Sequence, residues 1–316
     1  MTAPPSTAAQ TLAQVQAQVK RLQEDATTAA EGAQEAKVKL ATLTRSLAGI
    51  QAQAAVQGKT VDAISKSLGT IAVEQYKSGS ISQSLELLFS SDPGLYLSSA
   101  GSLEAITRRK STQLRKFQSA EQQLKATSLT VSDRLAQVKI LQKTLAQRSA
   151  LATAKLAQAQ TLLASLKKED RDRLAKLALE QENADQASSL VAAKSAAGIS
   201  GRAGIALKFA FKQIGKSYVF GAAGMKYWDC SGLTMKAFGA AGVSMPHSAA
   251  AQAQMGKYVP INKKQPGDLL FFGRPVSHVG IYIGGHRMVH APHPGSRVKV
   301  ADISLGLKTL VAVRRF

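Results

Sequence analysis

Several kinds of residue are scarce in this chain, and each scarcity excludes a class of protein. The 316 residues include one cysteine, so no disulfide can form within the chain. No apolar run approaches the ~20 residues that a membrane-spanning helix needs. Aromatic residues make up 5% of the chain and no nucleic-acid-binding motif occurs, so we expect no nucleic-acid partner. All five histidines follow residue 246, which confines any histidine chemistry to the C-terminal part.

The single cysteine lies where a turn gives way to a predicted helix. Cys230 follows Asp229 and precedes the apolar-periodic run from Leu233 to Phe238. A helix N-terminus carries a partial positive charge and unpaired amides, which favour a thiolate over a thiol. The position therefore predicts a nucleophilic sulfur. A small buried hydrophobe is the alternative interpretation of an isolated cysteine.

Two histidines lie on a predicted hairpin around a Gly-Gly pair at 284–285. Side chains alternate between the faces of a strand, so the loop length decides whether they meet. A two-residue turn would place His290 opposite Val279, on the wrong face. A three-residue loop places it opposite Gly280 and diagonal to His278, and the glycine leaves room. We predict the three-residue loop or a bulge.

Cys230, His278 and His290 would then form a nucleophile, a base and an orienting group. His278 takes the thiol proton and later protonates the leaving amine, while His290 fixes its tautomer and orientation. Zinc is the competing use of one cysteine and two histidines. The close ligand pairs typical of zinc sites do not occur around Cys230, so we predict neither a metal nor another cofactor.

Five ordered segments carry a resemblance to a known family: Gly215-Lys216-Ser217-Tyr218-Val219-Phe220-Gly221, Asp229-Cys230-Ser231-Gly232-Leu233, Met245-Pro246-His247-Ser248, Gln265-Pro266-Gly267-Asp268-Leu269-Leu270-Phe271-Phe272 and Ser277-His278-Val279-Gly280-Ile281-Tyr282. They resemble the NlpC/p60 cysteine peptidases of bacterial cell walls, over about residues 203 to 316. The resemblance implies an α+β, papain-like catalytic domain, in which the cysteine-bearing helix packs on an antiparallel sheet.

The resemblance also assigns roles to single residues. Cys230 is the nucleophile, His278 the base and His290 the third member. The Tyr218 hydroxyl would help the Cys230 amide to stabilise the oxyanion. Asp229 and Ser231 flank the nucleophile and are candidates for substrate contact, although Asp229 is equally suited to cap the helix.

The remaining histidines, His247, His286 and His293, are weaker candidates for a role in catalysis. His286 falls in the predicted hairpin loop and His247 follows a proline in a turn, so we expect both on the surface or at a rim of the site. His293 has no assigned role. Asp268 opens a predicted strand, where we expect it to be structural.

The first 186 residues have the pattern of long helices. Apolar residues alternate at spacings of three and four from Leu12 to Ile50, and a second, interrupted seam runs from Leu114 to Leu166. We predict a long all-α antiparallel coiled coil, because the segment between the seams can turn the chain back on itself. A homodimer through the same seams is the alternative.

Residues 73–106 contain helix breakers around an apolar run: Leu85, Leu87, Leu88 and Phe89. We expect a tip of short helices, which either pack on one another or bind a partner. Coiled-coil wall hydrolases of similar architecture are regulated by the FtsE–FtsX membrane complex, which the resemblance makes a candidate partner. Residues 187–202 are small and nearly uncharged, which predicts a flexible linker before the catalytic domain at 203–316.

Positive charge is concentrated in the C-terminal part. Residues 201–316 carry 16 Lys and Arg against three acids, a net of +13, whereas residues 1–200 carry 25 against 17, a net of +8. A basic domain concentrates at an anionic polymer, and peptidoglycan with anionic wall polymers fits the motifs better than nucleic acid does. The chain lacks a signal peptide, so we expect a secreted or wall-associated protein whose signal has been removed.

The predicted function is a secreted peptidoglycan hydrolase. The resemblance implies cleavage between γ-linked D-glutamate and diaminopimelate by a Cys-His-His thiol mechanism, with the coiled coil regulating access to the site. Three alternatives stay open. A CHAP-like N-acetylmuramoyl-L-alanine amidase cuts the sugar-to-peptide amide, an acyltransferase differs in its acceptor, and a non-catalytic wall-binding activator would need no intact triad.

Overall fold

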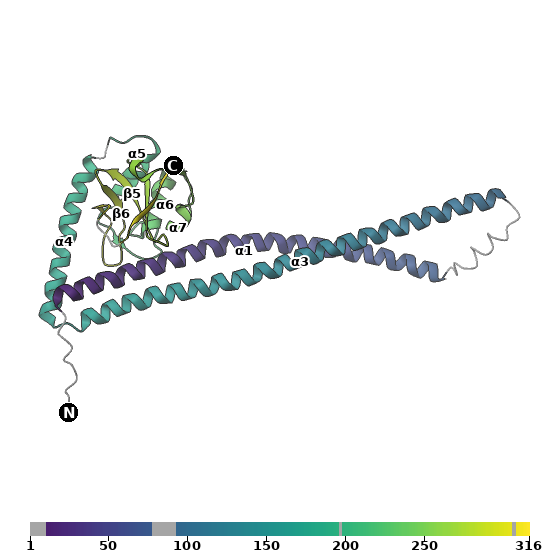
Figure 1. Ribbon diagram of the computed structural model, residues 1–316, viewed down its shortest axis with the longest axis horizontal. Coiled ribbons are helices and arrows are strands. Elements are labelled where there is room, and N and C mark those ends of the chain that lie inside the picture. Colours follow the sequence, from purple (N-terminus) through teal and green to yellow (C-terminus); the bar gives the residue numbers. More distant parts are fainter. Residues whose placement is uncertain (1–10, 78–92, 196–197, 305–307) are drawn as a thin grey trace, which may run out of the picture. The chain divides into compact units, whose positions relative to one another are not determined.

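The computed structural model describes residues 11–77, 93–195, 198–304 and 308–316. Its helices are α1 (Leu12–Lys77), α3 (Pro93–Ala164), α4 (Lys168–Ser195), α5 (Gly201–Phe211), α6 (Cys230–Ala240) and α7 (Ala249–Gln252), with the 3-10 helix η1 (Ile261–Lys263). Its strands are β1 (Ser217–Tyr218), β2 (Tyr227–Trp228), β3 (Lys257–Tyr258), β4 (Leu269–Phe272), β5 (His278–Gly284), β6 (Arg287–His290), β7 (Lys299–Asp302) and β8 (Leu310–Arg315) (Figure 1).

The chain divides into two compact units, residues 1–40 with 140–316, and residues 41–139. The long helices α1 and α3 contribute to both. In the first unit Val15 and Val19 pack with Ala159, and Lys155 pairs with Asp25 at 3.5 Å. These contacts join the start of α1 to the end of α3, so the two helices run antiparallel within one chain.

The second unit contains the far ends of the same two helices. The Ser67 hydroxyl donates to the Gln113 side chain at 3.3 Å, which again joins a late residue of α1 to an early residue of α3. The prediction of short tip helices at 73–106 is wrong for residues 73–77, which end α1, and for residues 93–106, which begin α3. Residues 78–92, with the apolar run, lie outside the described part of the chain. Within the described residues, no helix combines the length and the apolar character needed to span a membrane.

The prediction of a linker at 187–202 is wrong for residues 187–195, which belong to α4. This helix lies along β7, the strand at one edge of the sheet. Lys299 donates to Glu182 and to Asp185, each at 2.7 Å, and the Val300 amide donates to the Ser189 hydroxyl at 2.8 Å. Small residues therefore mark a helix face that approaches the strand closely, and α4 covers an edge that would otherwise be open.

A six-stranded sheet, in the order β3-β8-β4-β5-β6-β7, forms the centre of the C-terminal domain. All its recorded pairings are antiparallel. Side chains on β4 alternate between two cores, as a period of two requires. Leu269 and Phe271 pack with α5 and α6, whereas Leu270 and Phe272 join a smaller cluster on the other face. The predicted α+β fold, with the cysteine-bearing helix packed on an antiparallel sheet, is confirmed.

Candidate active site

Asp229 sets the start of helix α6. Its carboxylate accepts a hydrogen bond from the Gly232 amide at 2.6 Å, in the geometry of an N-cap. Cys230 is therefore the first helical residue, and it is fully buried. Leu233 and Phe238, further along α6, are buried in the main core and anchor the helix. The capping role of Asp229 is thus present in the structure, and it places the sulfur at the helix N-terminus as predicted.

His247 completes the surroundings of Asp229. Its Nε2 lies 2.8 Å from both carboxylate oxygens of Asp229, and its side chain is 20% exposed. Of the two expected positions, surface or rim of the site, the structure shows the rim, because the turn after Pro246 directs the ring back onto the start of α6. Gly232 permits this approach, since a Cβ there would lie 2.9 Å from His247 Nε2. A carboxylate that caps a helix uses only part of its acceptor capacity. The cap predicted at Asp229 was therefore a sign in the sequence that a second hydrogen-bond donor would contact it.

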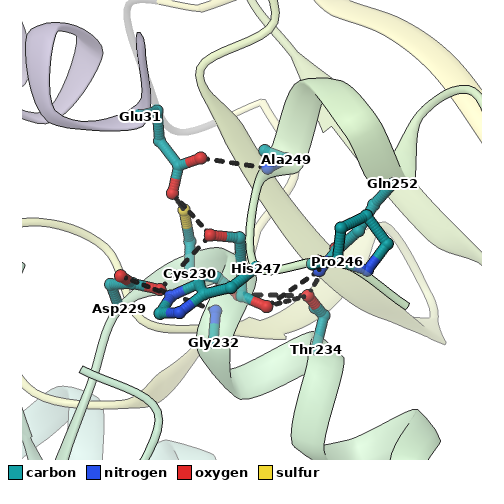
Figure 2. Close-up of polar contacts among 10 residues, drawn as sticks. Glu31, Asp229, Cys230, Gly232, Thr234, Pro246, His247, Ala249 and Gln252 are labelled. Carbon is teal, nitrogen blue, oxygen red and sulfur yellow. Dashed lines mark hydrogen bonds and ion pairs between the residues drawn. The ribbon is translucent and has the colours of Figure 1, made fainter. Parts of the chain in front are cut away.

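Gln252 holds the same turn against α6. This fully buried side chain donates to the carbonyls of Ser231 and Pro246, at 2.9 and 2.8 Å, and accepts from Thr234 at 2.7 Å. Figure 2 shows these contacts beside Cys230. The first turn of α6 is therefore held by side-chain hydrogen bonds as well as by its apolar packing.

The hairpin of β5 and β6 brings the two predicted histidines together. Ile281 pairs with Val289 and Tyr282 with Met288, and the register then shifts at Gly284, so the predicted loop or bulge is confirmed. Continuing the register places His290 opposite Gly280. His278 Nε2 and His290 Nδ1 are 2.7 Å apart. His286 lies exposed in the loop with a φ of 57°, as expected.

Gly280 provides the room for this pair. A Cβ at this position would lie 2.7 Å from the Met288 sulfur and 3.2 Å from the His290 Cβ. Burial lowers the pKa of His278 well below its usual range, and lowers that of His290 to about 3. Both rings are therefore neutral, and the proton between them belongs to one ring only. If His278 uses Nδ1 as the base, its Nε2–H donates to His290.

Tyr218, at the end of β1, is 5% exposed. Its hydroxyl makes no hydrogen bond of standard geometry with the residues that the structure describes, although the Thr27 side chain of α1 lies close enough to lower its pKa. Burial raises the pKa of this phenol well above its usual range, with added repulsion from a Cys230 thiolate. The neutral O–H is thus kept as a donor, and an unused buried donor costs free energy until an acceptor arrives.

Glu31, on α1, is the site residue that the sequence reasoning missed. Its Oε1 accepts from Cys230 Sγ at 3.1 Å and from the Ser231 hydroxyl at 2.7 Å. Its Oε2 accepts from the Ala249 amide at 3.0 Å, as Figure 2 shows. One signal was present: the residues three and four positions away are Thr27, Thr28, Gln34 and Glu35, so no cation on its own helix can pair with this carboxylate.

The thiol is in its neutral form in this arrangement. Burial raises the pKa of Cys230 well above its usual range, and the carboxylates of Glu31 and Asp229 raise it further. A hydrogen bond from the backbone of Val279, the neighbour of His278, lowers the pKa of Cys230 in part. The expectation of a thiolate from the helix N-terminus alone is therefore wrong for this state, because desolvation and two nearby carboxylates outweigh the helix dipole.

A thiol at a helix start, packed against a hairpin whose two strands carry a histidine pair, is the arrangement of papain-like thiol hydrolases. Residues 215–315 match the model of the NlpC/P60 family. This part of the chain is therefore an NlpC/P60 domain.

Two relatives each match less than a third of the chain. Probable endopeptidase Rv2190c of Mycobacterium tuberculosis is 45% identical over 94 residues, which are 30% of this chain and 24% of that protein. Gamma-D-glutamyl-L-lysine dipeptidyl-peptidase of Bacillus subtilis is 38% identical over 109 residues, 32% of this chain and 37% of that protein. This chain thus spans well under half the length of these relatives. The structure of Rv1477, a hypothetical invasion protein of Mycobacterium tuberculosis, shares 29% identity over 36% of this chain and 62% of that chain, with a TM-score of 0.34.

Proposed function

We propose that this protein is a peptidoglycan hydrolase that cleaves the bond between γ-linked D-glutamate and diaminopimelate in stem peptides. The observation that carries the proposal is the position of Cys230 at the start of α6, in an NlpC/P60 domain whose β5–β6 hairpin joins His278 to His290 at 2.7 Å. The name of the Bacillus subtilis relative, a γ-D-glutamyl-L-lysine dipeptidyl-peptidase, supports the γ-D-glutamyl side of the bond.

In the proposed mechanism, His278 accepts the thiol proton and Cys230 attacks the γ-carbonyl carbon. The oxyanion forms near the Cys230 amide and the Tyr218 hydroxyl, whose unused donor suits this role. His278 then protonates the leaving amine, and a thioester to the glutamyl group remains. Water, deprotonated by His278, hydrolyses the thioester and releases a γ-carboxylate. His290 orients His278 throughout.

Ser231 and Asp229 are proposed substrate contacts, in addition to the cap that Asp229 forms. Both side chains lie within one turn of the nucleophile and are buried in this state. The net +13 of residues 201–316 supports binding to anionic wall polymers, and a wall substrate implies a protein that works outside the cell membrane.

The test is mass spectrometry of muropeptides released from purified cell wall. Residues 201–316 and the full chain are each compared with their Cys230→Ala variants. The proposal expects fragments ending in γ-D-glutamate that the variants do not produce. Release of free stem peptides from the sugar would favour the amidase alternative, and transfer to an added amine would favour an acyltransferase. Equal release with and without Cys230 would contradict a thiol mechanism.

We also propose that the N-terminal helices regulate access to Cys230, since Glu31 of α1 contacts its sulfur. Residues 201–316 alone are then expected to hydrolyse wall faster than the full chain. The FtsE–FtsX complex is the proposed partner, through the segment around 73–106. A binding assay between residues 1–200 and the extracellular part of FtsX tests this, and no detectable binding would contradict it.

A further inference from the structure

The carboxylate of Glu31 occupies the space directly in front of the nucleophile. Its Oε1 lies 3.1 Å from the Cys230 sulfur. Reacting atoms in a productive complex approach to about 3–3.5 Å before attack. A substrate carbonyl carbon would therefore need the volume that this carboxylate fills.

Glu31 also accepts hydrogen bonds from donors that surround the Cys230 sulfur. The Ser231 hydroxyl and the Ala249 amide both donate to it, at 2.7 and 3.0 Å. The Glu31 side chain is 3% exposed, so these bonds form away from solvent. In Figure 2 its carboxylate points from α1 between Cys230 and Ala249. Any substrate group that needs the same donors must displace it.

The helix that carries Glu31 has small side chains where it packs against its neighbours. Ala29 and Ala30 are buried against Ala152 of α3, and Phe220 of the catalytic domain packs on the same cluster. Small side chains let the helix axis approach the domain closely. One turn further on, Gln34 approaches Gly221, where an added Cβ would lie 3.0 Å from its Nε2. The position of the Glu31 carboxylate is therefore fixed by a packed helix.

We propose that Glu31 is an intramolecular inhibitor of the Cys230 site, acting both by occupying the approach to the sulfur and by opposing its ionisation. This inference rests on the proposed function, because it assigns the regulation of that same site. A negative charge at 3.1 Å disfavours a thiolate, so the nucleophile stays protonated while α1 is docked.

The inhibition is built to be reversible. Burial raises the pKa of Glu31 above its usual range, and the Asp229 charge raises it further, so the docked carboxylate is held at a cost. The ionisable groups that face it are Cys230, Asp229, Tyr218 and Lys308. Its bonds to Ala249, Ser231 and Cys230 offset part of that cost. Displacement of Glu31 into solvent by a substrate or partner would relieve this burial cost.

The first experiment measures the alkylation rate of Cys230 by iodoacetamide in the full chain, where it is the only cysteine. Glu31→Ala is compared with the native chain and with Glu35→Ala. Glu35 lies one turn away on α1 and pairs with Lys39, so it controls for loss of an acid from the same helix. We expect alkylation at least about tenfold faster for Glu31→Ala and unchanged for Glu35→Ala, because one pKa unit alone changes the thiolate fraction tenfold.

The second experiment isolates the charge. Glu31→Gln has nearly the same shape, so α1 stays docked, and the thiolate is followed by its ultraviolet absorbance during a pH titration, with Cys230→Ala as the blank. We expect the apparent pKa of Cys230 to fall by about one unit or more. An unchanged thiol pKa would overturn the electrostatic part of the proposal. This variant also serves as the test if Glu31→Ala does not fold.

Muropeptide release by the same full-length variants separates this inference from the proposed function. Faster alkylation and faster release by Glu31→Ala support both. Faster alkylation with no release by any variant supports the role of Glu31 and contradicts the hydrolase. Equal rates of alkylation and of release for Glu31→Ala and the native chain overturn the inference, whatever the reaction is.

Discussion

The sheet domain and the long helices bury their side chains in different ways. The sheet domain fully buries large residues such as Phe238, Phe271 and Leu233. In α1 most of the buried positions are alanine or valine and lie between Val15 and Ala36. Among the described residues of α1 after Leu40, Leu47 is the one buried side chain.

The difference shows where stability and regulation reside. Apolar burial contributes about 25 cal/mol per Å², so a core of large side chains can hold the sheet domain together. An alanine seam contributes less, and it needs a partner surface to be buried at all. The early part of α1 can therefore be separated from the active site at a lower cost than the domain can be unfolded.

Acid should unfold the sheet domain before the helices. The folded state lowers the pKa of His278, His290 and His293, and all histidines lie in the sheet domain. A histidine with a lowered pKa contributes stability above about pH 6.5, which is lost as the pH falls towards the folded value, about 3 for His290. At about 1.4 kcal/mol per pKa unit, the shift of His290 from 6.5 to about 3 corresponds to a loss on the order of 5 kcal/mol.

Two spectroscopic signals separate the regions in that experiment. Trp228 is the only tryptophan and is buried in the sheet domain, so its fluorescence reports on that domain. Far-ultraviolet circular dichroism reports mainly on the long helices. We expect the fluorescence transition at the higher pH, and a shallower one for His290→Gln. Coincident transitions would show that the two regions are not separable in this way.

His290→Ala should lower the rate of wall hydrolysis by roughly 10²-fold, because His278 loses the group that fixes its tautomer and orientation. His286→Ala, in the exposed loop of the same hairpin, should have little effect. The measurement is the initial rate of muropeptide release by residues 168–316, which retain α4. A His290→Ala rate equal to the His286→Ala rate would show that the 2.7 Å contact with His278 is not needed.

A larger side chain should destabilise the early, buried part of α1 and leave the later, exposed part unaffected. Ala29→Leu forces a larger side chain into the cluster with Ala152 and Phe220, at a cost of about 1–3 kcal/mol. Ala52→Leu lies at an exposed position and should change stability by less than about 0.5 kcal/mol. Thermal unfolding measures both, and alkylation of Cys230 should accelerate only for Ala29→Leu. Equal alkylation rates for the two variants would show that the packing of Ala29 does not control access to Cys230.

Lys299→Met should weaken the attachment of α4 to the edge strand by about 1–2 kcal/mol, since Glu182 and Asp185 lose a shared cation in a partly buried setting. Lys194→Met removes a charge from the exposed side of the same helix and serves as the control. Urea unfolding followed by Trp228 fluorescence measures the difference. Equal stabilities would mean that the packing of Ser189 and Ala192 holds α4 without the ion pairs.

Local patterns predicted much of the site. The apolar run after Cys230 identified α6, and the Gly-Gly pair with its flanking strands identified the hairpin. The face on which His290 lies followed from the two-residue period of strands, and the observed bulge confirms it. The heptad seams predicted two long helices that run antiparallel, as the contacts of Val15 and Ala159 bear out.

Other features depended on contacts that no local pattern encodes. Residues 187–195 have the composition of a linker, yet they form the end of α4 where Ser189 meets Val300. His247 was expected on the surface or at a rim of the site, and the contact with Asp229 that fixes it lies 18 positions earlier in the chain. The pKa of Cys230 is raised by burial and then by the carboxylate of Glu31, which lies 199 positions away in the chain.

The sequence by itself determined the elements and their chemistry: a thiol at a helix start, two histidines on one face of a hairpin, and two long helices with apolar seams. These follow from interactions within a few residues along the chain. Only the tertiary structure decided that Glu31 faces the sulfur and that the thiol is neutral. The physical reason is that desolvation and Coulomb interactions depend on distance in space, and the folded chain brings α1 and α6 together across most of its length.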